Sequence, residues 1–241
     1  MTLPTPAPKP GCPNCILLGQ GLCGFLFDLG LDRPVPDLPP ISQKQFEFAA
    51  RRTIFHRNQI LDGVPVICDG WAAATIKLSD GSRQILSFIL PGELVTSRLV
   101  FESQLHVSID SITNGSYRSF DRKQLRAALD SAPKTFDRIM AAYNTESRRA
   151  DLLITALGRR SASERVAGLL VDLWDRLDRL GKIEGDSVEF PLRQTHIADA
   201  TGLTTVYVNK VLAEFRHDGL IEISDRHLQI LDMTQLQRLV T

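Results

Sequence analysis

The length, composition and charge of the chain set the first limits on its function. Its 241 residues suffice for one large domain or two modest ones, each able to bury a core. Hydrophobic residues make up 43% and charged residues 23%, as in an ordinary soluble globular protein. The formal net charge of +0 does not exclude nucleic acid as a partner, because only the local distribution of charge matters.

The beginning of the chain argues against export. Residues 1–10 are rich in proline and lack the apolar stretch of a secretory signal. No run in the sequence approaches the ~20 apolar residues of a membrane span. We therefore expect a cytoplasmic protein with no membrane partner. Structural disulfides are rare in that compartment, so its cysteines should be free, reactive or bound to metal.

Three cysteines follow within a glycine-rich stretch. Cys12, Cys15 and Cys23 have the spacing Cys-x2-Cys-x7-Cys, and three thiolates spaced in this way can hold a metal ion or an iron–sulfur cluster. The remaining thiol, Cys68, is either a further ligand or an ordinary half-buried cysteine. In the second case another residue completes the cluster, or there is no cluster. Zinc and a thiol redox switch are the alternatives to a cluster.

Residues 42–120 begin with a helical pattern and continue with a β pattern. The segment 42–51 predicts a short helix. From about residue 53 to residue 120, β-rich runs are separated by the turn pairs Asp62-Gly63, Asp69-Gly70, Asp80-Gly81, Pro91-Gly92 and Asn114-Gly115. Turn signals every ~8–12 residues predict an all-β barrel or roll.

A long helix is predicted after the β segment. Pro133 fits its first turn and Gly158 suits its end. Positions spaced alternately four and three residues apart form a heptad seam between them: Phe136, Met140, Tyr143, Ser147, Ala150, Ile154 and Leu157. Such a seam packs against a partner helix. We favour a second copy of the chain, because Arg148, Arg149 and Asp151 leave only a narrow apolar stripe. The alternative is packing on the helix's own domain.

The segment 193–231 carries the most specific pattern. Before it, residues 161–164 have capping-box spacing and begin another helix. A short helix over 194–200, a tight turn at 201–203 and a second helix that Thr204 can cap form a helix-turn-helix. The runs 220–223 and 227–230 then alternate as a hairpin, which is the wing. A helical hairpin that packs within the protein and does not read DNA is the alternative.

The second helix of this unit would place its first turns in the major groove of DNA. The residues that point outward there are Thr205, Val206, Tyr207, Asn209 and Lys210. Asn pairs with adenine, Lys reaches guanine, and Val can meet a thymine methyl group. The residues predicted to contact phosphates, which position the protein without reading the sequence, are Arg193, His196, Arg216 and His217.

These motifs, in this order and spacing, resemble the Crp/Fnr superfamily over nearly the whole chain. The resemblance is carried by residues 80–94 (DGSRQILSFILPGEL), 162–167 (ASERVA) and 196–204 (HIADATGLT). It implies an α+β fold with an N-terminal β-roll similar to cyclic nucleotide-binding jelly rolls, a long dimerisation helix and a C-terminal winged helix-turn-helix. The implied divisions are 1–132, with the cysteine-containing leader and the sensor, 133–158 and 159–241.

The resemblance also implies a function. A Crp/Fnr-like protein would bind an inverted repeat in double-stranded DNA as a homodimer and would act with RNA polymerase. The chain departs from the family's cyclic-nucleotide binders, because Glu93 is present but the stretch 105–108 lacks the arginine that holds the phosphate. We therefore expect no cAMP. At positions 206, 209 and 210 the residues also differ from the Glu-x-x-Ser-Arg of the Fnr branch, so the half-site can differ too.

The N-terminal cysteines resemble the cluster ligands of Fnr-like oxygen sensors, which hold a [4Fe–4S] cluster. In that family the fourth cysteine precedes the dimerisation helix, at a place that here corresponds to Tyr117 or Arg118. Cys68 is thus the candidate for the fourth ligand. The resulting hypothesis is a regulator that responds to oxygen or redox state. Its alternative is a Crp/Fnr-type regulator without a cluster, constitutive or gated by thiol oxidation, zinc or another small ligand.

Two other classes fit the sequence less well. A regulatory subunit that controls a partner enzyme through its β-roll would not need a wing and a recognition helix. An enzyme would need a catalytic constellation, and the five histidines at positions 56, 106, 196, 217 and 227 are scattered without one. We therefore predict that the protein is not an enzyme.

Overall fold

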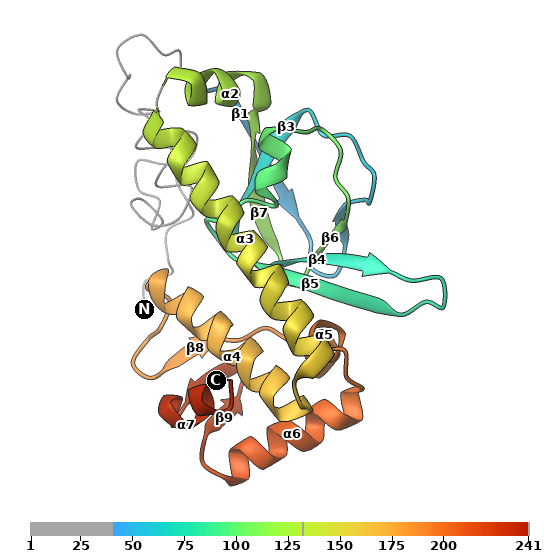
Figure 1. Ribbon diagram of the computed structural model, residues 1–241, viewed down its shortest axis with the longest axis vertical. Helices are drawn as coiled ribbons and strands as arrows, with labels where there is room; N and C mark the ends of the chain where they lie inside the picture. Colours follow the sequence, from blue (N-terminus) through green and yellow to red (C-terminus); the bar gives the residue numbers. More distant parts are fainter. Residues whose placement is uncertain (1–40, 132, 241) are drawn as a thin grey trace, which may run out of the picture.

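The computed structural model describes residues 41–131 and 133–240 (Figure 1). Within these ranges the chain forms a β-roll, a long helix, and a helical C-terminal half that contains a small sheet. This mixture confirms the predicted α+β class. Among residues 41–131 and 133–240, none of the helices combines the length and the hydrophobicity of a membrane span.

The β-roll consists of two antiparallel sheets. One sheet has the strand order β1-β7-β3 and the other has the order β2-β6-β4-β5. The strands are β1 (Gln43–Phe48), β2 (Thr53–Phe55), β3 (Gly63–Asp69), β4 (Ala72–Lys77), β5 (Arg83–Ile89), β6 (Ser108–Ser111) and β7 (Gly115–Asp121). Buried side chains such as Val66, Leu105 and Phe120 belong to one hydrophobic cluster inside the roll. The predicted all-β character of this segment is confirmed.

The prediction of a helix over residues 42–51 is wrong, because this segment contains strand β1. The whole length of β1 pairs antiparallel with β7. Phe46 in β1 also stacks on Tyr117 in β7, with ring centroids 4.9 Å apart. Strand preference depends on such cross-strand partners, and β7 lies far along the chain. A local helical pattern therefore misleads at this position.

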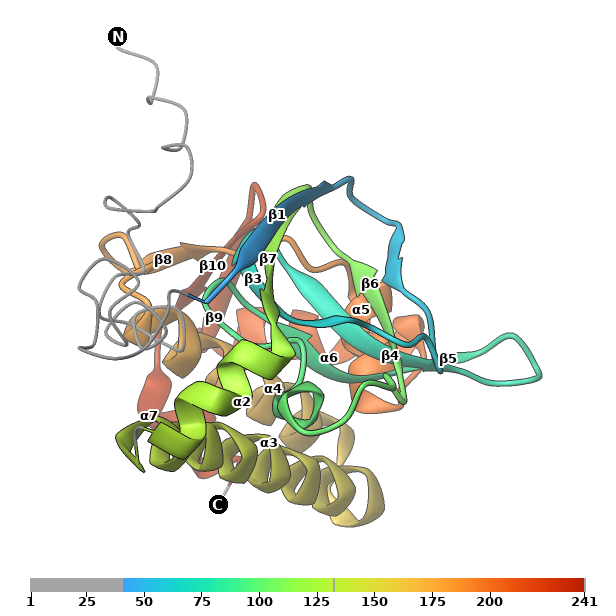
Figure 2. The same ribbon diagram turned by 90° about the horizontal axis from the view of Figure 1, so that it is seen from above.

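Two helices follow the β-roll and lie along one side of it, α2 (Arg122–Ser131) and α3 (Pro133–Arg159) (Figure 2). The 3-10 helix η1 (Ser97–Val100) joins the roll to α3. Glu146 of α3 accepts hydrogen bonds from the Ser97 backbone N at 2.8 Å and from Ser97 Oγ at 3.0 Å. Burial raises the pKa of Glu146, although these hydrogen bonds oppose the shift. The face of α3 that carries Glu146 therefore packs against the β-roll.

The C-terminal half holds four helices and three short strands. They are α4 (Ala162–Arg179), β8 (Ser187–Glu189), α5 (Gln194–Thr201), α6 (Thr205–His217), β9 (Ile221–Ser224), β10 (His227–Ile230) and α7 (Met233–Arg238), and the strand order is β8-β10-β9. The predicted capping box is present at the start of α4. Glu164 N donates to Ser161 Oγ at 3.3 Å, and Ser161 N donates to Glu164 Oε2 at 2.6 Å.

The C-terminal half shares its hydrophobic core with the β-roll. Trp71, Phe88 and Leu90 of the roll belong to the same cluster of buried side chains as residues of α4, α5 and α6. Trp71 meets Phe190 edge-on, with ring centroids 6.5 Å apart. The division at 132/133 and 158/159 stays a prediction, although this core joins the first of those segments to the last. The position of the helix-turn-helix therefore depends on the roll.

Candidate nucleic-acid interface

Helices α5 and α6 are joined by a turn that requires Gly202. The φ of this residue is 65°, in the left-handed region that favours glycine. A Cβ atom at Gly202 would lie 2.9 Å from Cδ2 of Leu157 in α3, so the turn packs closely on the long helix. Thr204 then caps α6, because its Oγ1 accepts a hydrogen bond from Tyr207 N at 3.2 Å.

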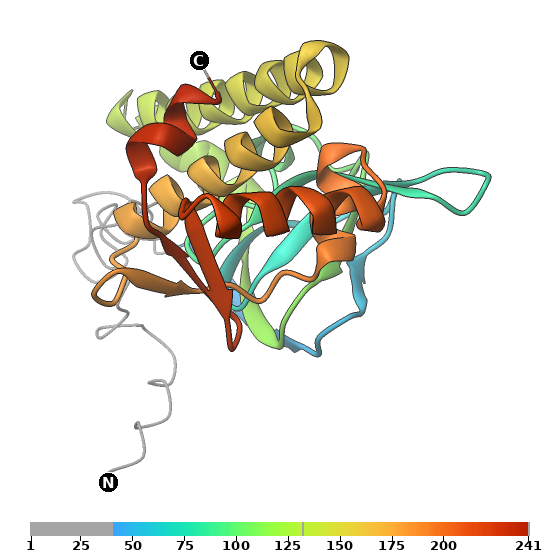
Figure 3. The ribbon, with the colours of Figure 1, turned by 90° about the horizontal axis from the view of Figure 1, so that it is seen from below.

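Helix α6 has one buried and one exposed face. Val208, Val211, Leu212 and Phe215 are buried against the rest of the C-terminal half. The exposed face carries the predicted base-reading residues, all within the first two turns. Val206 is 79% and Tyr207 is 49% exposed. Asn209 and Lys210 are exposed too, and Thr205 is half-buried. Figure 3 shows α6 lying across one end of the molecule, with the strands of the wing beside it.

The polar side chains on this face are only loosely engaged. Lys210 Nζ lies 3.9 Å from Glu214 Oε1 and 5.9 Å from the centre of the Tyr207 ring, and the Lys210 side chain is 67% exposed. Within the part of the chain that the structure describes, the Asn209 carboxamide has no hydrogen-bond partner. An exposed carboxamide and ammonium on one helix face can be offered to the edges of bases.

Strands β9 and β10 form the predicted wing. They pair antiparallel, and Asp225 and Arg226 between them have φ angles of 48° and 63°. Two successive positive φ angles are typical of the type I′ turns whose twist matches a hairpin. Arg226 is exposed, and its Nη2 lies 3.7 Å from Glu189 Oε1 of β8. The tip of the wing therefore presents a weakly held cation.

The structure separates the four residues predicted to contact phosphates. Arg193, Arg216 and His217 are exposed. His196 is only 9% exposed, and its Nδ1 accepts a hydrogen bond from Arg193 N at 3.1 Å. Burial and the charges of Arg83 and Arg193 lower the pKa of His196. The ring of His196 therefore caps the start of α5 and is largely covered, and its predicted phosphate contact stays a prediction.

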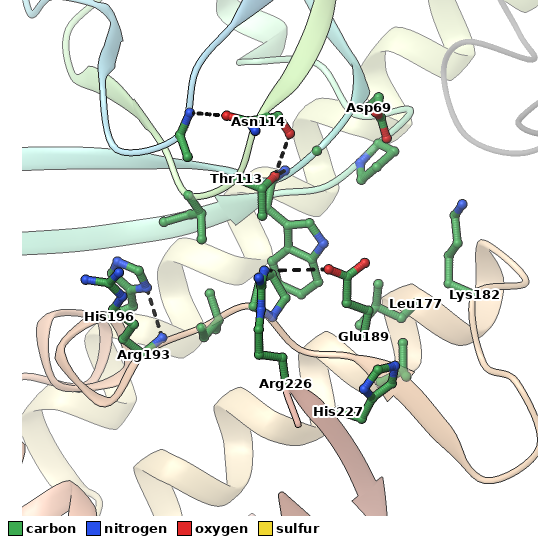
Figure 4. A pocket seen from close by; sticks show the side chains of 18 of the residues that line it. Asp69, Thr113, Asn114, Leu177, Lys182, Glu189, Arg193, His196, Arg226 and His227 are labelled. Atoms are coloured by element: carbon green, nitrogen blue, oxygen red, sulfur yellow. Dashed lines mark hydrogen bonds and ion pairs between the residues drawn. The ribbon is translucent and has the colours of Figure 1, made fainter. Parts of the chain in front are cut away.

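A cleft of about 1020 Å³ lies between the β-roll, the wing and the start of α5 (Figure 4). Arg193, Arg226 and Lys182 contribute cations to its lining, and Asp69 and Glu189 contribute carboxylates. Figure 4 shows Arg226 and Glu189 directed toward each other within this lining. The mixed signs do not make the single positive surface that attracts a phosphate backbone. The face formed by α6 and the wing is the better candidate interface.

Sequence reasoning missed the side chains that hold α3 and α4 of the chain against the β-roll. Glu93, which the sequence places in a nucleotide-binding motif, bonds to Arg176 Nη2 at 2.6 Å and to Arg149 Nη1 at 3.4 Å. Burial alone would raise the pKa of Glu93, but Arg176 and Arg149 outweigh it and hold the pKa low. These partners lie far apart in the sequence, so no local motif marks them. The absence of cAMP binding stays a prediction.

The heptad seam on α3 is mostly exposed in the described chain. Phe136 is 45%, Tyr143 40% and Ile154 69% exposed. Ser147 and Ala150 between them are exposed too. Two members of the seam differ, since Met140 and Leu157 are half-buried, and Leu157, the last of them, packs on the turn at Gly202. An exposed apolar stripe therefore remains along the middle of α3.

The cysteine site falls mostly outside the described residues, because Cys12, Cys15 and Cys23 lie in the segment 1–40. Cys68 is half-buried in β3, and its Sγ lies 3.8 Å from the Val66 carbonyl oxygen. Over 41–131 and 133–240, no three His, Cys, Asp or Glu side chains gather in a group that could hold a metal ion. The cluster and its fourth ligand stay predictions.

Comparison with known proteins accounts for both halves of this arrangement. The model of the cyclic nucleotide-binding domain matches residues 45–132, and the model of the Crp-like helix-turn-helix domain matches residues 164–239. The chain belongs to the Crp/Fnr family. The predicted likeness to this family is thus confirmed, and the likeness is to the family's regulators rather than to enzymes.

Crp/Fnr relatives are similar along almost the whole chain. The transcriptional activatory protein AadR of Rhodopseudomonas palustris is 28% identical, over 91% of this chain and 88% of its own length. The nitrogen fixation regulation protein FixK of Bradyrhizobium diazoefficiens is 27% identical, over 95% and 93%. The structure of FixK2 from Bradyrhizobium japonicum superimposes with a TM-score of 0.75, at 24% identity, over 83% of this chain and 98% of that one. The protein is a Crp/Fnr-type transcription regulator.

Proposed function

We propose that the protein binds double-stranded DNA as a homodimer and reads an inverted repeat with the first two turns of α6. The observation that carries this proposal is the exposed, loosely engaged face of Val206, Asn209 and Lys210 beside the wing. In helix-turn-helix proteins this part of the second helix lies in the major groove. In that groove the Asn209 carboxamide suits adenine, the Lys210 ammonium suits guanine, and the methyl groups of Val206 suit the methyl group of thymine.

Selection of bound duplexes from a random pool tests this function. We expect an inverted repeat whose half-sites lie about one helical turn apart. Enrichment of a single unrepeated half-site would contradict the dimer, and no enrichment would contradict sequence-specific binding. The protein bound at such a site would recruit or exclude RNA polymerase. Transcription from the selected sequence, measured with purified components, distinguishes the two effects.

The exposed stripe on α3 supports the dimer. Burying the large side chains of Phe136, Tyr143 and Ile154 against a second copy would contribute on the order of 1.5–3 kcal/mol each before ordering costs. An alternative is that Glu146 or Asp151, two acidic residues that flank the seam, repels the same residue of the second copy and makes the dimer conditional. Glu146 is instead hydrogen-bonded to Thr96 and Ser97 of its own β-roll, while Asp151 is exposed. We therefore infer a dimer that does not depend on a metal cluster.

Analytical ultracentrifugation separates these alternatives. The variant that combines Cys12→Ser, Cys15→Ser and Cys23→Ser should sediment as a dimer at micromolar concentration. Replacing Ile154 by Asp places a charge in the middle of the stripe and should shift the same protein toward monomer. A monomeric cysteine variant would show that the N-terminal cysteines control assembly.

We also propose that Cys12, Cys15 and Cys23 hold a [4Fe–4S] cluster, with Cys68 as the fourth ligand. The support is the spacing of the three thiols and the resemblance to Fnr-like oxygen sensors. The half-buried Cys68 supplies the remaining thiol of the chain. When bound, such a cluster would supply a group that oxygen can oxidise and break down.

Anaerobic purification followed by iron and sulfide analysis tests the cluster. The protein should be brown and should lose its colour in air. The Cys68→Ser variant should lose most of the iron. Stoichiometric zinc without sulfide would contradict the cluster, and a fully loaded Cys68→Ser protein would contradict the fourth ligand.

The alternative is a regulator that needs no cluster and is constitutive or gated by thiol oxidation, zinc or another ligand. The observation that favours it is the docking of the helix-turn-helix on the β-roll by direct ion pairs and a shared core. DNA binding by the triple cysteine variant in air decides between them. Binding equal to that of the anaerobic wild type would favour the constitutive regulator.

A further inference from the structure

One polar contact attaches the first helix of the helix-turn-helix to the β-roll. Arg83, the first residue of β5, donates from Nε and Nη2 to Asp199 Oδ2 of α5 at 2.8 and 2.6 Å. Next to it, Gln84 Nε2 donates to the Ala200 carbonyl oxygen at 3.3 Å. Both Arg83 and Asp199 are about a quarter exposed. Charge-assisted contacts of this length are among the stronger ones in proteins.

The β-roll end of this contact is itself anchored. Arg83 Nη1 also lies 3.8 Å from Oδ2 of Asp110, which is only 8% exposed. Thr53 and Thr75 donate hydrogen bonds to Asp110 at 2.7 and 2.9 Å. One guanidinium therefore lies between two carboxylates, a rigid one in the β-roll and a second one in α5. Without the arginine, two negative charges would face each other across the junction.

A second contact, between the β-roll and α4, holds the other end of the boundary between the β-roll and the C-terminal half. Arg176 of α4 is 4% exposed and donates to Glu93 Oε2 and to the Phe88 carbonyl oxygen, each at 2.6 Å. Asp172 accepts from Arg176 at 3.1 Å, and Arg149 of α3 lies 3.7 Å from Asp172. The β-roll is thus tied to α5 at one point and to α4, together with the long helix α3, at another, so the direction of α6 relative to α3 is restrained.

We propose that Arg83 and Asp199 are positioning residues that set which half-site spacing the dimer accepts. The inference rests on the proposed dimeric binding of an inverted repeat. In a dimer joined along α3, the separation of the two α6 helices depends on how each is oriented relative to its own α3. The Arg83–Asp199 contact restrains that orientation at the more exposed end of the junction, where it can be altered without opening the buried Arg176 site. Neither residue needs to touch DNA.

The experiment measures affinity for the selected inverted repeat and for duplexes in which the half-site separation is one or two base pairs shorter or longer. Full-length wild type, Arg83→Gln, Asp199→Asn and the double variant are compared. Arg83→Gln should weaken binding at the selected spacing by about tenfold and bring the other spacings within about threefold of it, the scale of one charge-assisted contact. Asp199→Asn should have a smaller effect on affinity and on spacing preference. It leaves Asp110 as the only carboxylate beside Arg83, so no two negative charges face each other.

The double variant provides the sharpest readout. It replaces Asp199 as well as Arg83, so Asp110 no longer faces a second negative charge. The double variant should therefore discriminate between spacings better than Arg83→Gln alone, which is a non-additive result. Base preference within a half-site should be unchanged in all three proteins. Arg57→Gln and Asp186→Asn, exposed charges in the β-roll and the C-terminal half, are the matched controls and should behave as wild type.

Two outcomes would overturn the proposal. An equal loss of affinity at every spacing would assign the pair a merely structural role, and an unchanged spacing profile would assign it none. Both differ from failure of the proposed function, in which the wild type itself would select no inverted repeat.

Discussion

The helix-turn-helix has two surfaces that treat their polar side chains in opposite ways. On the outward face of α6, Asn209 has no partner within the described ranges, and Lys210 has one distant carboxylate at 3.9 Å. On the surface that faces the β-roll, Asp199 of α5 accepts two hydrogen bonds from Arg83 of the roll at 2.8 and 2.6 Å, and Arg176 of the preceding helix α4 donates to Glu93 at 3.2 and 2.6 Å. The same domain therefore contains one face with polar groups available for a ligand and another whose polar groups are already used.

This difference has an energetic reason. A buried charge must be paired, because leaving it unpaired costs several kcal/mol. An exposed polar group costs little, since water satisfies it until a partner displaces the water. Substitutions on the inner surface should therefore change stability and orientation, whereas substitutions on the outer face should change DNA binding alone.

The largest effect should come from the buried arginine. Arg176→Met leaves the half-buried Glu93 without its main partner and removes the buried end of the pair, so it should lower the free energy of unfolding by about 3 kcal/mol. Urea denaturation measures this. Arg179→Met, an exposed change on the same helix, is the control and should stay within about 0.5 kcal/mol. A loss below 1 kcal/mol for Arg176→Met would show that the Glu93 contact is not needed to dock the halves.

The next effect tests the outer face. Lys210→Ala or Asn209→Ala should weaken binding to the selected operator by roughly 1–3 kcal/mol and relax the preference at one base pair, with unchanged stability. Arg216→Ala should weaken binding to all sequences alike and flatten its salt dependence. Titrations on matched and single-base-changed duplexes measure both. If the Lys210 and Arg216 variants keep wild-type affinity and preference, α6 is not the reading helix as placed here.

A smaller effect concerns pH. The pKa of His196 is lowered in the folded protein by burial and by Arg83 and Arg193, so the unfolded state binds more protons around its ordinary pKa. Stability should therefore fall as pH falls through about 6.5 and below, and should be retained at higher pH. His196→Gln should remove this contribution, so the difference in unfolding free energy between the two proteins should change with pH over that range. A constant difference would mean that His196 does not titrate as its burial implies.

The last comparison is between two neighbouring valines of α6, and the change at Val206 should have the smallest effect of all. Val206→Ala should leave stability within about 0.5 kcal/mol, because the side chain is 79% exposed. Val208→Ala should cost about 1–3 kcal/mol, because that side chain is fully buried. Thermal or urea unfolding measures both. Equal costs at the two positions would contradict the assignment of the outer face.

Local features of this molecule could be predicted from the sequence because each depends on residues close together in the chain. The capping box of Ser161 and Glu164, the turn at Gly202 and the cap at Thr204 each involve positions within one or two helical turns. The apolar spacing of α6 likewise indicates which of its residues are buried. The helix-turn-helix and the direction in which Asn209 and Lys210 point follow from such short-range rules.

Other features were decided by tertiary structure alone. The segment 42–51 became a strand because β7 pairs with it, and His196 is largely buried because α5 packs against the β-roll. Arg83 and Asp199 are 116 residues apart, and Arg176 and Glu93 are 83 apart. No periodicity or motif relates side chains at such separations, since their contact exists only after two halves of the chain have packed. Local rules in the sequence therefore fixed which face of α6 stays exposed, and the packing of the β-roll on α5 and α4 fixed how that face is held.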